Sequence, residues 1–401
     1  MEFTLQRHIP DAGICVVLML AAAICVWWVT GLHEHIRILI DSRADDVWFE
    51  ADVARVFDDM SSPGANHHRT SVHPLFPAVA IPLVGLCAKL FGLSKMQAVR
   101  VVVAASAGLW IVLFYGLLRL LRCRRLDAVV FSLAAASSAG AMFWSAIPET
   151  YVLGSSTIIA ALILAAAAER RPIPAWLDVT IGAASLSMLV TNFMVWLASL
   201  VTRHRLQHAI QLACNALLAV VLLWAVEKYL LPSSQFFMGA HEKSGAPPMG
   251  SGLAVIFLHS MVMPEAWSLP NEQVGLWPKI SLQHTALGHI DALKVVALAS
   301  WLCLLCAGAW ALARLPQYPR FRAMLALSIA GQLALHMVYG NETFLYALDW
   351  IPLFVTAAAL ATLGRGRWVV LTLASVFAVT AGIHNAQQLQ ATLALLISNA
   401  T

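Results

Sequence analysis

The stretch "PLFPAVAIPLVGLCAKLFGL", residues 74–93, decides how the rest of this chain is threaded through a membrane. It is apolar and long enough to cross a hydrocarbon core. Its prolines, Pro74, Pro77 and Pro82, argue against a plain spanning helix, because proline removes a backbone hydrogen bond and kinks a helix. We therefore predict that residues 74–93 lie along the membrane or re-enter it, without crossing.

The composition places the chain among membrane proteins. Of its 401 residues, 60% are hydrophobic and 11% are charged, whereas a soluble domain carries about 25% charged residues. A polytopic integral membrane protein is therefore expected. The formal net charge of +4 is too small to suggest nucleic acid as a partner. Nearly all of the seven cysteines lie inside apolar runs, which favours packing in helices over metal or redox chemistry.

Apolar runs near twenty residues long predict the spanning helices. The stretch 175–201 is also long, but it is broken at Thr191-Asn192, which predicts two short helices that meet there. The expected fold is an all-α polytopic bundle of about eleven transmembrane helices, forming a single membrane domain over residues 1–401. The continuous runs cover residues 13–32, 101–120, 128–147, 151–168, 210–230, 292–312, 323–339, 345–363 and 368–383.

The positions of Lys and Arg predict which loops share a side of the membrane. Cytoplasmic loops carry an excess of these residues, so the compact basic loops and the N-terminus are expected to be cytoplasmic. All of these loops fall on the same side of the membrane as the N-terminus only if residues 74–93 do not cross it. One long external loop then covers residues 33–97 and contains juxtamembrane helices, and a second covers residues 232–291. The basic loops are residues 121–127, 169–174, 202–205, 313–322 and 364–367.

The predicted external segments hold most of the polar chemistry. "DDVWFEADVARVFDDMSSPGANHHRTSVHP", residues 45–74, contains six carboxylates, three histidines and two arginines. The turn "IPETY" adds Glu149, and "YGNETF" adds Glu342. Such groups at a membrane face suit chemistry on a substrate with one polar end and one lipid end. A solvated loop whose charges keep it out of the bilayer explains the first segment equally well.

The spacing within the first external loop predicts local structure. Residues 45–60 have helical periodicity, with Val47, Ala51, Ala54 and Phe57 expected to face the membrane. The carboxylates at 58 and 59 are expected to cap or solvate the following turn. In the second external loop, the apolar piece 253–263 is too short to span and is expected to lie at the interface. The tail from residue 384 is expected to be external, with a small amphipathic helix.

Several ionisable residues fall in or near the predicted spans: Asp178, Glu227, Lys228, Lys294 and Asp349. An ionisable group inside a bilayer is a functional candidate by default. Most of these lie near span ends, where lysine can extend to the surface. Asp349 lies about one helical turn beyond Leu345-Tyr346, where it would support a site or pair with a neighbour.

The segment that follows the acids resembles the "HPP-L … FG-S … R" signature of the first outer loop in GT-C membrane glycosyltransferases. That superfamily includes protein O-mannosyltransferase-like, aminoarabinose transferase-like and rhizobial galacturonosyltransferase-like proteins. The family has Pro-Pro where this chain has Pro74-Leu75. The turn "WSAIPETYVLG", residues 144–154, is similar to the family's second outer turn, with Glu149 as the matching acid. The signature residues here are His73, Pro74, Leu75, Phe91, Gly92, Ser94 and Arg100.

The resemblance implies a transferase that moves a sugar from a polyprenyl-phosphate donor to a hydroxyl of a glycan, lipid or protein acceptor. A carboxylate would act as general base, negative charge would favour an oxocarbenium-like state, and arginine or histidine would hold the leaving phosphate. The alanine-rich helices suggest a bacterial inner membrane, with the active site facing the periplasm.

The resemblance also implies which residues form the site. The family's base is an acid soon after the first span, so Asp46 or Asp45 is the first candidate and Asp52 the next, with Glu149 as a further catalytic acid. No tight ligand spacing such as H-E-x-x-H is present, so no metal site is predicted, although the acids and histidines are residue types that could bind a divalent ion. Substrate contacts are expected from Glu50, His67, His68, Arg69, His73 and Glu342.

Three other classes of protein compete with this interpretation. A transporter or flippase would need buried charges along a path, or broken helices at matching positions of two repeats. An O-antigen polymerase or ligase shares the lipid substrate but usually has its large active loop later in the chain. Residues 232–291 form such a later loop here, so this class stays an alternative. A non-catalytic assembly subunit would not need the clustered acids.

Overall fold

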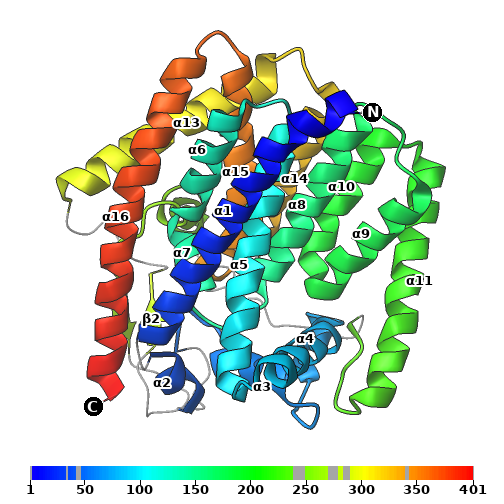
Figure 1. Ribbon diagram of the computed structural model, residues 1–401, viewed down its shortest axis with the longest axis vertical. Helices are drawn as coiled ribbons and strands as arrows, with labels where there is room; N and C mark the ends of the chain where they lie inside the picture. The colour runs from blue at the N-terminus through cyan, green and yellow to red at the C-terminus, as the bar shows by residue number, and fades with distance from the viewer. Residues whose placement is uncertain are drawn as a thin grey trace.

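The computed structural model describes residues 2–32, 35–41, 47–237, 249–269, 279–282, 290–338 and 343–400. These residues form a bundle of long helices with shorter elements packed across one end (Figure 1). The described part contains one small sheet, an antiparallel ribbon of β1 (Trp267–Leu269) and β2 (Lys279–Ser281). The chain is thus an all-α polytopic membrane protein, as its composition predicts.

Seven helical segments of the described chain are long and apolar enough to cross a membrane. The other predicted spans are broken, shorter or less apolar. Residues 128–147 form α6 (Arg125–Ala136) and α7 (Ala139–Ser145), which meet at a bend of 65°. The remaining predicted spans form the shorter or less apolar helices α9 (Ala175–Met188), α10 (Phe193–Arg203) and α14 (Pro319–Val338). The seven are α1 (Glu2–Leu32), α5 (Lys95–Leu120), α8 (Tyr151–Ala168), α11 (Leu206–Leu230), α13 (Ala292–Arg314), α15 (Ala347–Leu360) with its flanking turns, and α16 (Arg367–Ala400).

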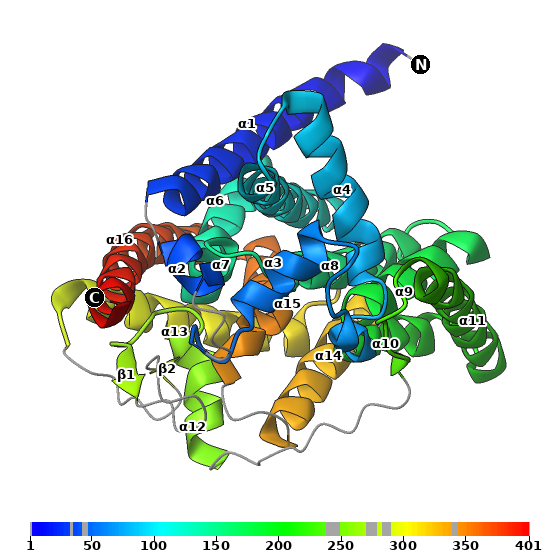
Figure 2. The ribbon, with the colours of Figure 1, turned by 90° about the horizontal axis from the view of Figure 1, so that it is seen from below.

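Residues 74–93 do not cross the bundle. They form α4 (Phe76–Phe91), which lies across the lower end of the molecule in Figure 1, as the view from below in Figure 2 also shows. α1 ends and α5 begins at this same end. Gly92 ends α4 in a left-handed conformation (φ 63°), and Ser94 starts α5 as an N-cap. The outward face of α4 is apolar, which suits a helix lying in a membrane interface.

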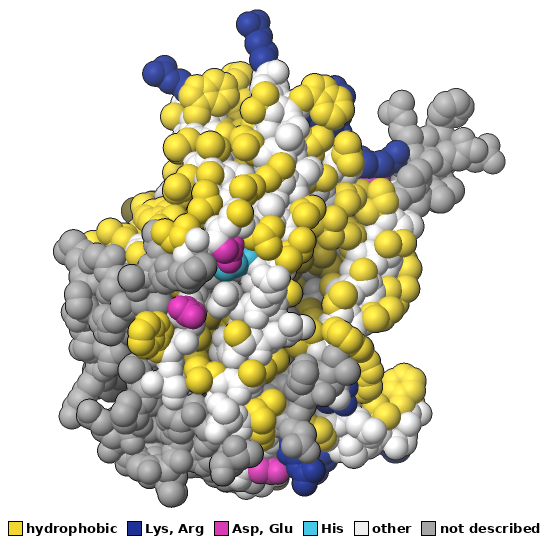
Figure 3. Space-filling model, turned by 90° about the vertical axis from the view of Figure 1, so that its left-hand side faces the viewer, with side chains coloured by type: hydrophobic (Ala, Val, Ile, Leu, Met, Phe, Trp, Pro, Cys, Tyr) yellow, Lys and Arg dark blue, Asp and Glu magenta, His cyan; other side chains and the backbone are white. Residues whose placement is uncertain are grey.

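The predicted cytoplasmic loops meet at the opposite end, which we call the basic end. Arg367 Nη2 lies 2.6 Å from Asp127 Oδ1, which joins two of these loops. The Phe321 N–H donates to Glu169 Oε1 at 2.7 Å, which joins two more. Arg203 pairs with Asp178 at the start of α9. Figure 3 shows basic side chains projecting at the top of a flank that is otherwise largely hydrophobic. We call the end that holds α3 (Val53–Ser61) and α4 the acidic end.

The break between α9 and α10 is present where Thr191-Asn192 predicted it. A short turn, η2 (Val190–Asn192), separates the two helices. Val190 N–H donates to Val72 O at 3.1 Å, and Leu75 N–H donates to Ser187 O at 3.0 Å. The first loop therefore supplies partners for backbone groups that a helix end leaves unpaired. This pairing fastens the first loop to the bundle.

The apolar piece 253–263 is buried inside the bundle, so its predicted interfacial position is wrong. It continues from α12 (Met249–Ala254) into η4 (Val255–His259) and then passes the bend between α6 and α7. Gly140 N–H donates to Ser260 O at 2.9 Å and Ala139 N–H to Met261 O at 3.2 Å. The bend exposes amide groups at the start of α7, and this segment pairs with them.

The predicted end of the last span is also wrong, because α16 continues as one helix to Ala400. His384 and Asn385 are buried rather than part of an external tail. Asn385 Oδ1 accepts from Met263 N–H at 2.8 Å, and its Nδ2 donates to Ser137 O at 2.8 Å. The asparagine thus joins α16 to the bend and to the buried segment.

Gly31 allows Arg100 to hold the end of α1 against α5. A Cβ at Gly31 would overlap Arg100 Nη2, so the guanidinium would have to move. Arg100 donates to Trp27 O at 3.0 Å and lies 4.1 Å over the Trp27 ring. We expect Gly31→Ala to displace the guanidinium and lower the free energy of unfolding by about 1–2 kcal/mol. Thermal unfolding in detergent measures this. Gly85→Ala on α4, where a Cβ meets nothing within 4 Å, is the control, and equal losses in both variants would refute the assignment.

Candidate functional site

The described part of the first loop begins with α2 (His35–Asp41) and continues, from residue 47, with a buried turn. Phe49 N–H donates to Ile280 O at 3.0 Å, and Ile280 N–H donates to Val47 O at 2.8 Å, so the turn pairs with β2. Phe49 and Glu50 have φ of 49° and 65°, in the left-handed region that side chains disfavour. The Phe49 ring lies 5.1 Å from that of Phe344. This packing holds the turn in its strained conformation.

The helix expected over residues 45–60 therefore begins only at α3, after residue 52. The aromatic pair at 48 and 49 is wholly buried, and its packing overrides the local periodicity. The expectation that Val47, Ala51 and Ala54 face the membrane is wrong, because all three are buried in the protein.

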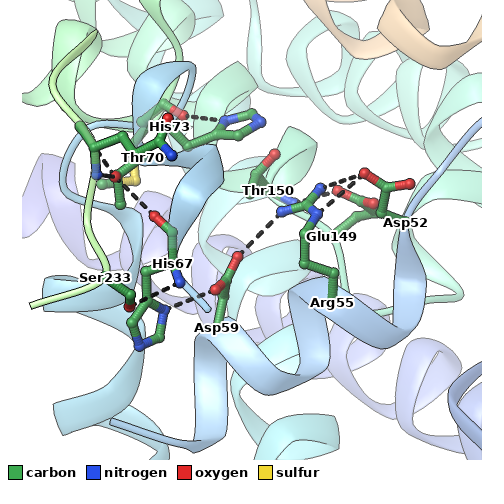
Figure 4. Close-up of polar contacts among 11 residues, drawn as sticks. Asp52, Arg55, Asp59, His67, Thr70, His73, Glu149, Thr150 and Ser233 are labelled. Carbon is green, nitrogen blue, oxygen red and sulfur yellow. Dashed lines mark hydrogen bonds and ion pairs between the residues drawn. The ribbon is translucent and has the colours of Figure 1, made fainter. Parts of the chain in front are cut away.

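Arg55 joins two carboxylates along α3. Its Nε and Nη2 lie 3.0 and 2.8 Å from Asp52 Oδ2, and its Nη1 lies 3.1 Å from Asp59 Oδ2 (Figure 4). Spacings of three and four residues bring these side chains to one face of a helix. The Asp52 side chain is 21% exposed and that of Asp59 is 4% exposed. Asp52 thus lies at the rim of the cluster and Asp59 inside it.

Asp59 continues the cluster inward to His67. His67 Nδ1 lies 2.7 Å from Asp59 Oδ1, and the histidine side chain has no exposed surface. Burial alone would lower the pKa of His67, but the hydrogen bond and charge of Asp59 outweigh burial and raise it. The expectation that Asp59 caps or solvates a turn is wrong, since it is an interior ion-pair partner. Ser233 Oγ accepts from His67 N–H at 3.0 Å, which fastens the loop to the segment after α11.

Glu149 comes from a different part of the chain and joins the same cluster. It lies in the turn between α7 and α8, is 7% exposed, and accepts a hydrogen bond from Thr150 N–H at 2.9 Å. Figure 4 shows it beside Arg55 and Asp52. Burial raises the pKa of Glu149 to about 7, while the charges of Arg55 and Arg69 act in the opposite direction. The structure therefore brings Asp52 and Glu149 together at the acidic end.

The other predicted site residues lie at varying depth. His73 is buried, its Nδ1 lies 2.8 Å from Met188 O, and burial lowers its pKa to about 3. Glu50, His68 and Arg69 are partly buried on the same loop. Asp45, Asp46 and Glu342 lie outside the described residues. The segment that follows Glu342, η5 (Thr343–Tyr346), contacts the helix after Glu149, where the Tyr151 and Tyr346 rings lie 6.1 Å apart.

Sequence reasoning did not assign a role to Arg55 or to Glu227 in this cluster. The i, i+3 and i, i+4 spacing of Asp52, Arg55 and Asp59 was a usable signal. Glu227 carried a weaker one, as an acid near the end of a span. Its Oε1 accepts from Ala78 N–H of α4 at 3.2 Å, and its charge acts on His67. Across the described ranges, no three His, Cys, Asp or Glu side chains come together in a way that could hold a metal ion.

An apolar cavity of about 290 Å³ lies between α1, α5, α6, α7 and α16. At α7 its lining includes Ser145 and Ala146, three residues before Glu149. Small residues from the bend between α6 and α7 contribute to the space. The cavity thus lies among the membrane-spanning helices, and its lining at α7 is close in the chain to Glu149. Residues that line it include Leu18, Ala22, Trp110, Ala141, Met142 and Gly382.

The bundle and its arrangement define an all-α polytopic membrane protein, and its fold is similar to that of a solved membrane enzyme of the kind that the first-loop resemblance implied. The solved structures to which it is similar are of ArnT from Cupriavidus metallidurans. The apo structure is 15% identical, with a TM-score of 0.53 over 97% of this chain and 78% of that chain. The structure bound to undecaprenyl phosphate is 15% identical, with a TM-score of 0.55 over 95% and 77%. No protein family model and no curated protein matches the chain.

Asp349 on α15 faces Asn192 in the break between α9 and α10. Both side chains are wholly buried, and Asn192 is adjacent to the backbone that pairs with the first loop. Neither side chain has a hydrogen-bond partner among the described residues. We expect Asp349→Leu to raise the free energy of unfolding by about 1–3 kcal/mol, because it removes a buried carboxyl that has no partner. Asp349→Asn keeps a buried polar group and should change stability by less than half as much. Thermal unfolding in detergent gives the comparison.

The control for this pair is Thr356→Val on the same helix. The Thr356 hydroxyl is also buried without a partner among the described residues, so its loss should raise stability as well, but by less than the loss of a carboxyl. A loss of stability in Asp349→Leu would show instead that the carboxyl is hydrogen-bonded to Asn192.

Proposed function

We propose that this chain is a GT-C glycosyltransferase that moves a sugar from a polyprenyl-phosphate donor to a hydroxyl acceptor at the acidic end of the bundle. The observation that supports this most is the convergence of Glu149 with Asp52, Arg55 and Arg69, from separate parts of the chain, in a protein with the fold of ArnT. The ArnT structure with undecaprenyl phosphate bound supports a polyprenyl phosphate as the lipid partner. The acceptor is a glycan, a lipid or a protein.

Glu149 is the described carboxylate best suited to act as general base. Asp52 and Asp59 are both paired with Arg55, so oxygens of both carboxylates are already engaged by a cation and are less available to an acceptor hydroxyl. Burial instead gives Glu149 a pKa of about 7, near the operating pH of most enzymes. Asp45, Asp46 and Asp52 remain candidates for the same task, as the family comparison implies.

The reaction follows from these assignments. The carboxylate takes the proton of the acceptor hydroxyl while that oxygen bonds to the anomeric carbon of the sugar. The bond between the anomeric carbon and the phosphate oxygen breaks, and the lipid phosphate leaves with the electron pair. Negative charge at Asp52, and at Glu149 before it has taken the proton, favours the oxocarbenium-like transition state in which the two bonds are exchanged.

The loop cations are proposed to receive the leaving phosphate. Arg69 is close enough to Glu149 for its charge to act there, and an arginine can bind phosphate through two hydrogen bonds. His68 adjoins it, and Glu50 and Glu342 are proposed sugar contacts. His67 and His73 are buried and bonded inward, so we assign them to positioning the loop.

The apolar cavity is proposed to hold part of the isoprenoid tail, because it is lined by apolar residues of the spanning helices and its lining includes Ala146, three residues before Glu149. The basic end would face the cytoplasm, since cytoplasmic loops carry the excess of Lys and Arg. The acidic end would then face the periplasm of a bacterial inner membrane. This orientation brings the phosphate of a membrane-embedded donor to the same level as the carboxylate cluster.

The first test replaces the proposed base. Glu149→Gln should lower kcat by about 100-fold or more, because general-base catalysis typically contributes about 10²–10⁴-fold. In the unchanged protein, kcat should rise with pH through about 7, because only the ionised carboxylate can accept a proton. The measurement is release of lipid phosphate from a panel of polyprenyl-phosphate sugars between pH 5 and 9.

Binding of polyprenyl phosphate to the same variant is the control. A transferase whose base is Glu149 loses turnover and keeps lipid binding, whereas a non-catalytic assembly subunit loses neither. A pH profile that stays flat through neutrality, with full turnover in Glu149→Gln, would remove Glu149 from the mechanism.

The second test narrows the apolar cavity. Ala22→Phe on α1 adds an aromatic ring to the cavity lining. Displacing about two methylene groups of a bound tail would raise the KM for the donor roughly tenfold, with little change in kcat at saturation. Val17→Phe is the matched control, because Val17 lies on the same helix, is 66% exposed and does not line the cavity. Equal KM values for the two variants would place the tail elsewhere.

A further inference from the structure

A second cavity, with a mixed apolar and basic lining, lies at the basic end, away from the proposed active site. Its volume is about 460 Å³, and it sits where the loop after α13 meets the loop before α16. α13, α15 and α16 are all candidate membrane spans that end or begin here, so the cavity is at the level of a membrane surface. Its lining consists of Trp310, Arg314, Leu315, Pro316, Gln317, Leu363, Gly364 and Arg365.

The charge of this cavity is unbalanced. Arg314 and Arg365 both line it, and no acidic residue does. Neither arginine has a hydrogen bond or an ion pair to any described residue. Two guanidinium groups that share one cavity repel each other, and an anion bound between them would remove that repulsion.

Several other arginines at the basic end differ from these two, because they pair with acids of the described chain. Arg119 and Arg125 pair with Asp11, and Arg367 pairs with Asp127. Arg203 pairs with Asp178. These side chains hold the helices together. Arg314 and Arg365 have no such role, and they are the arginines that line a cavity.

The remaining lining residues suit a group at a membrane surface. Trp310 is 56% exposed beside the cavity, and tryptophan concentrates at the level of lipid headgroups. Leu315 and Leu363 supply apolar walls, and the Gln317 amide can donate a hydrogen bond. Paired arginines recognise phosphate through parallel hydrogen bonds, which a lysine cannot reproduce.

We propose that this cavity binds a phosphate group, carried by an anionic membrane lipid of the adjoining leaflet or free in solution. Arg314 and Arg365 would hold the phosphate oxygens, and Trp310 would pack against the part of the ligand that enters the membrane. Basic pockets between membrane helices are known to take anionic headgroups. The inference does not depend on the proposed glycosyltransferase activity, because none of these residues belongs to the acidic end.

The test measures lipid binding to the full chain purified in detergent, by native mass spectrometry. Phosphatidylglycerol and phosphatidylcholine with matched acyl chains are the probes. The unchanged protein should retain phosphatidylglycerol preferentially. Arg314→Gln with Arg365→Gln should weaken that retention roughly thirtyfold, from the typical contribution of two arginines near an anionic surface. The charge-conserving variant, Arg314→Lys with Arg365→Lys, should retain phosphatidylglycerol to an intermediate degree. It keeps the positive charge but loses the bidentate hydrogen bonding of arginine.

The matched control is Arg171→Gln with Arg205→Gln, two exposed arginines of the basic loops that do not line the cavity. It should bind phosphatidylglycerol as the unchanged protein does. The variant with lysine at both positions keeps the positive charge that sets membrane orientation. Weaker lipid retention in that variant is therefore not caused by a changed orientation. Equal losses in the control and the cavity variants, or none in the cavity variants, would overturn the proposal.

A second arm separates the two sources of phosphate. Inorganic phosphate is added to the protein with and without phosphatidylglycerol, and thermal unfolding is recorded for the unchanged and glutamine variants. Retention of the lipid at millimolar phosphate supports a lipid ligand. Displacement of the lipid, with stabilisation by phosphate alone that the glutamine variant lacks, supports a soluble phosphate ligand. Absence of both effects would refute the site.

Discussion

The arrangement of this protein depends on satisfying the backbone of its broken helices. An unpaired amide or carbonyl in a membrane interior is strongly unfavourable, and both α6–α7 and α9–α10 leave such groups where they break. Segments from the loops fill these positions. Val72 and Leu75 pair with the backbone at Val190 and Ser187, and the buried segment at Ser260 pairs with the start of α7. These backbone hydrogen bonds hold the loops against the bundle, and they thereby position the site residues that the loops carry.

The sequence predicted those features that depend on composition and on local chain chemistry. Prolines and the distribution of basic residues placed α4 across one end, and Thr191-Asn192 located the helix break. The features it did not predict have partners far away in the chain. The turn at Phe49 is held by Ile280 and Phe344, and Asp59 is buried against His67. Periodicity contains no information about such partners, so it predicted a membrane-facing helix and a solvated acid.

The residues behind the family resemblance are structural, and this explains why they were visible in one sequence. Gly92 ends α4, Ser94 caps α5, and His73 fastens the loop to Met188. Arg100 donates to the Trp27 carbonyl of α1. Gly92 and Ser94 have local roles with a fixed spacing, which a short signature can record, whereas His73 and Arg100 bond to residues far away in the chain. The acids that the proposed chemistry needs are placed by tertiary contacts, and their spacing is free to vary.

The distinct character of Glu149 follows from how charge is shared at the acidic end. Arg55 pairs with both Asp52 and Asp59, and Asp59 also pairs with His67. These carboxylates have close cationic partners, whereas the hydrogen bond recorded for Glu149 comes from a neutral amide. Burial therefore dominates its titration and raises its pKa to about 7. An arginine already paired with two acids cannot fully neutralise a third, so the pairing that stabilises the loop is also what leaves Glu149 able to exchange a proton near neutral pH.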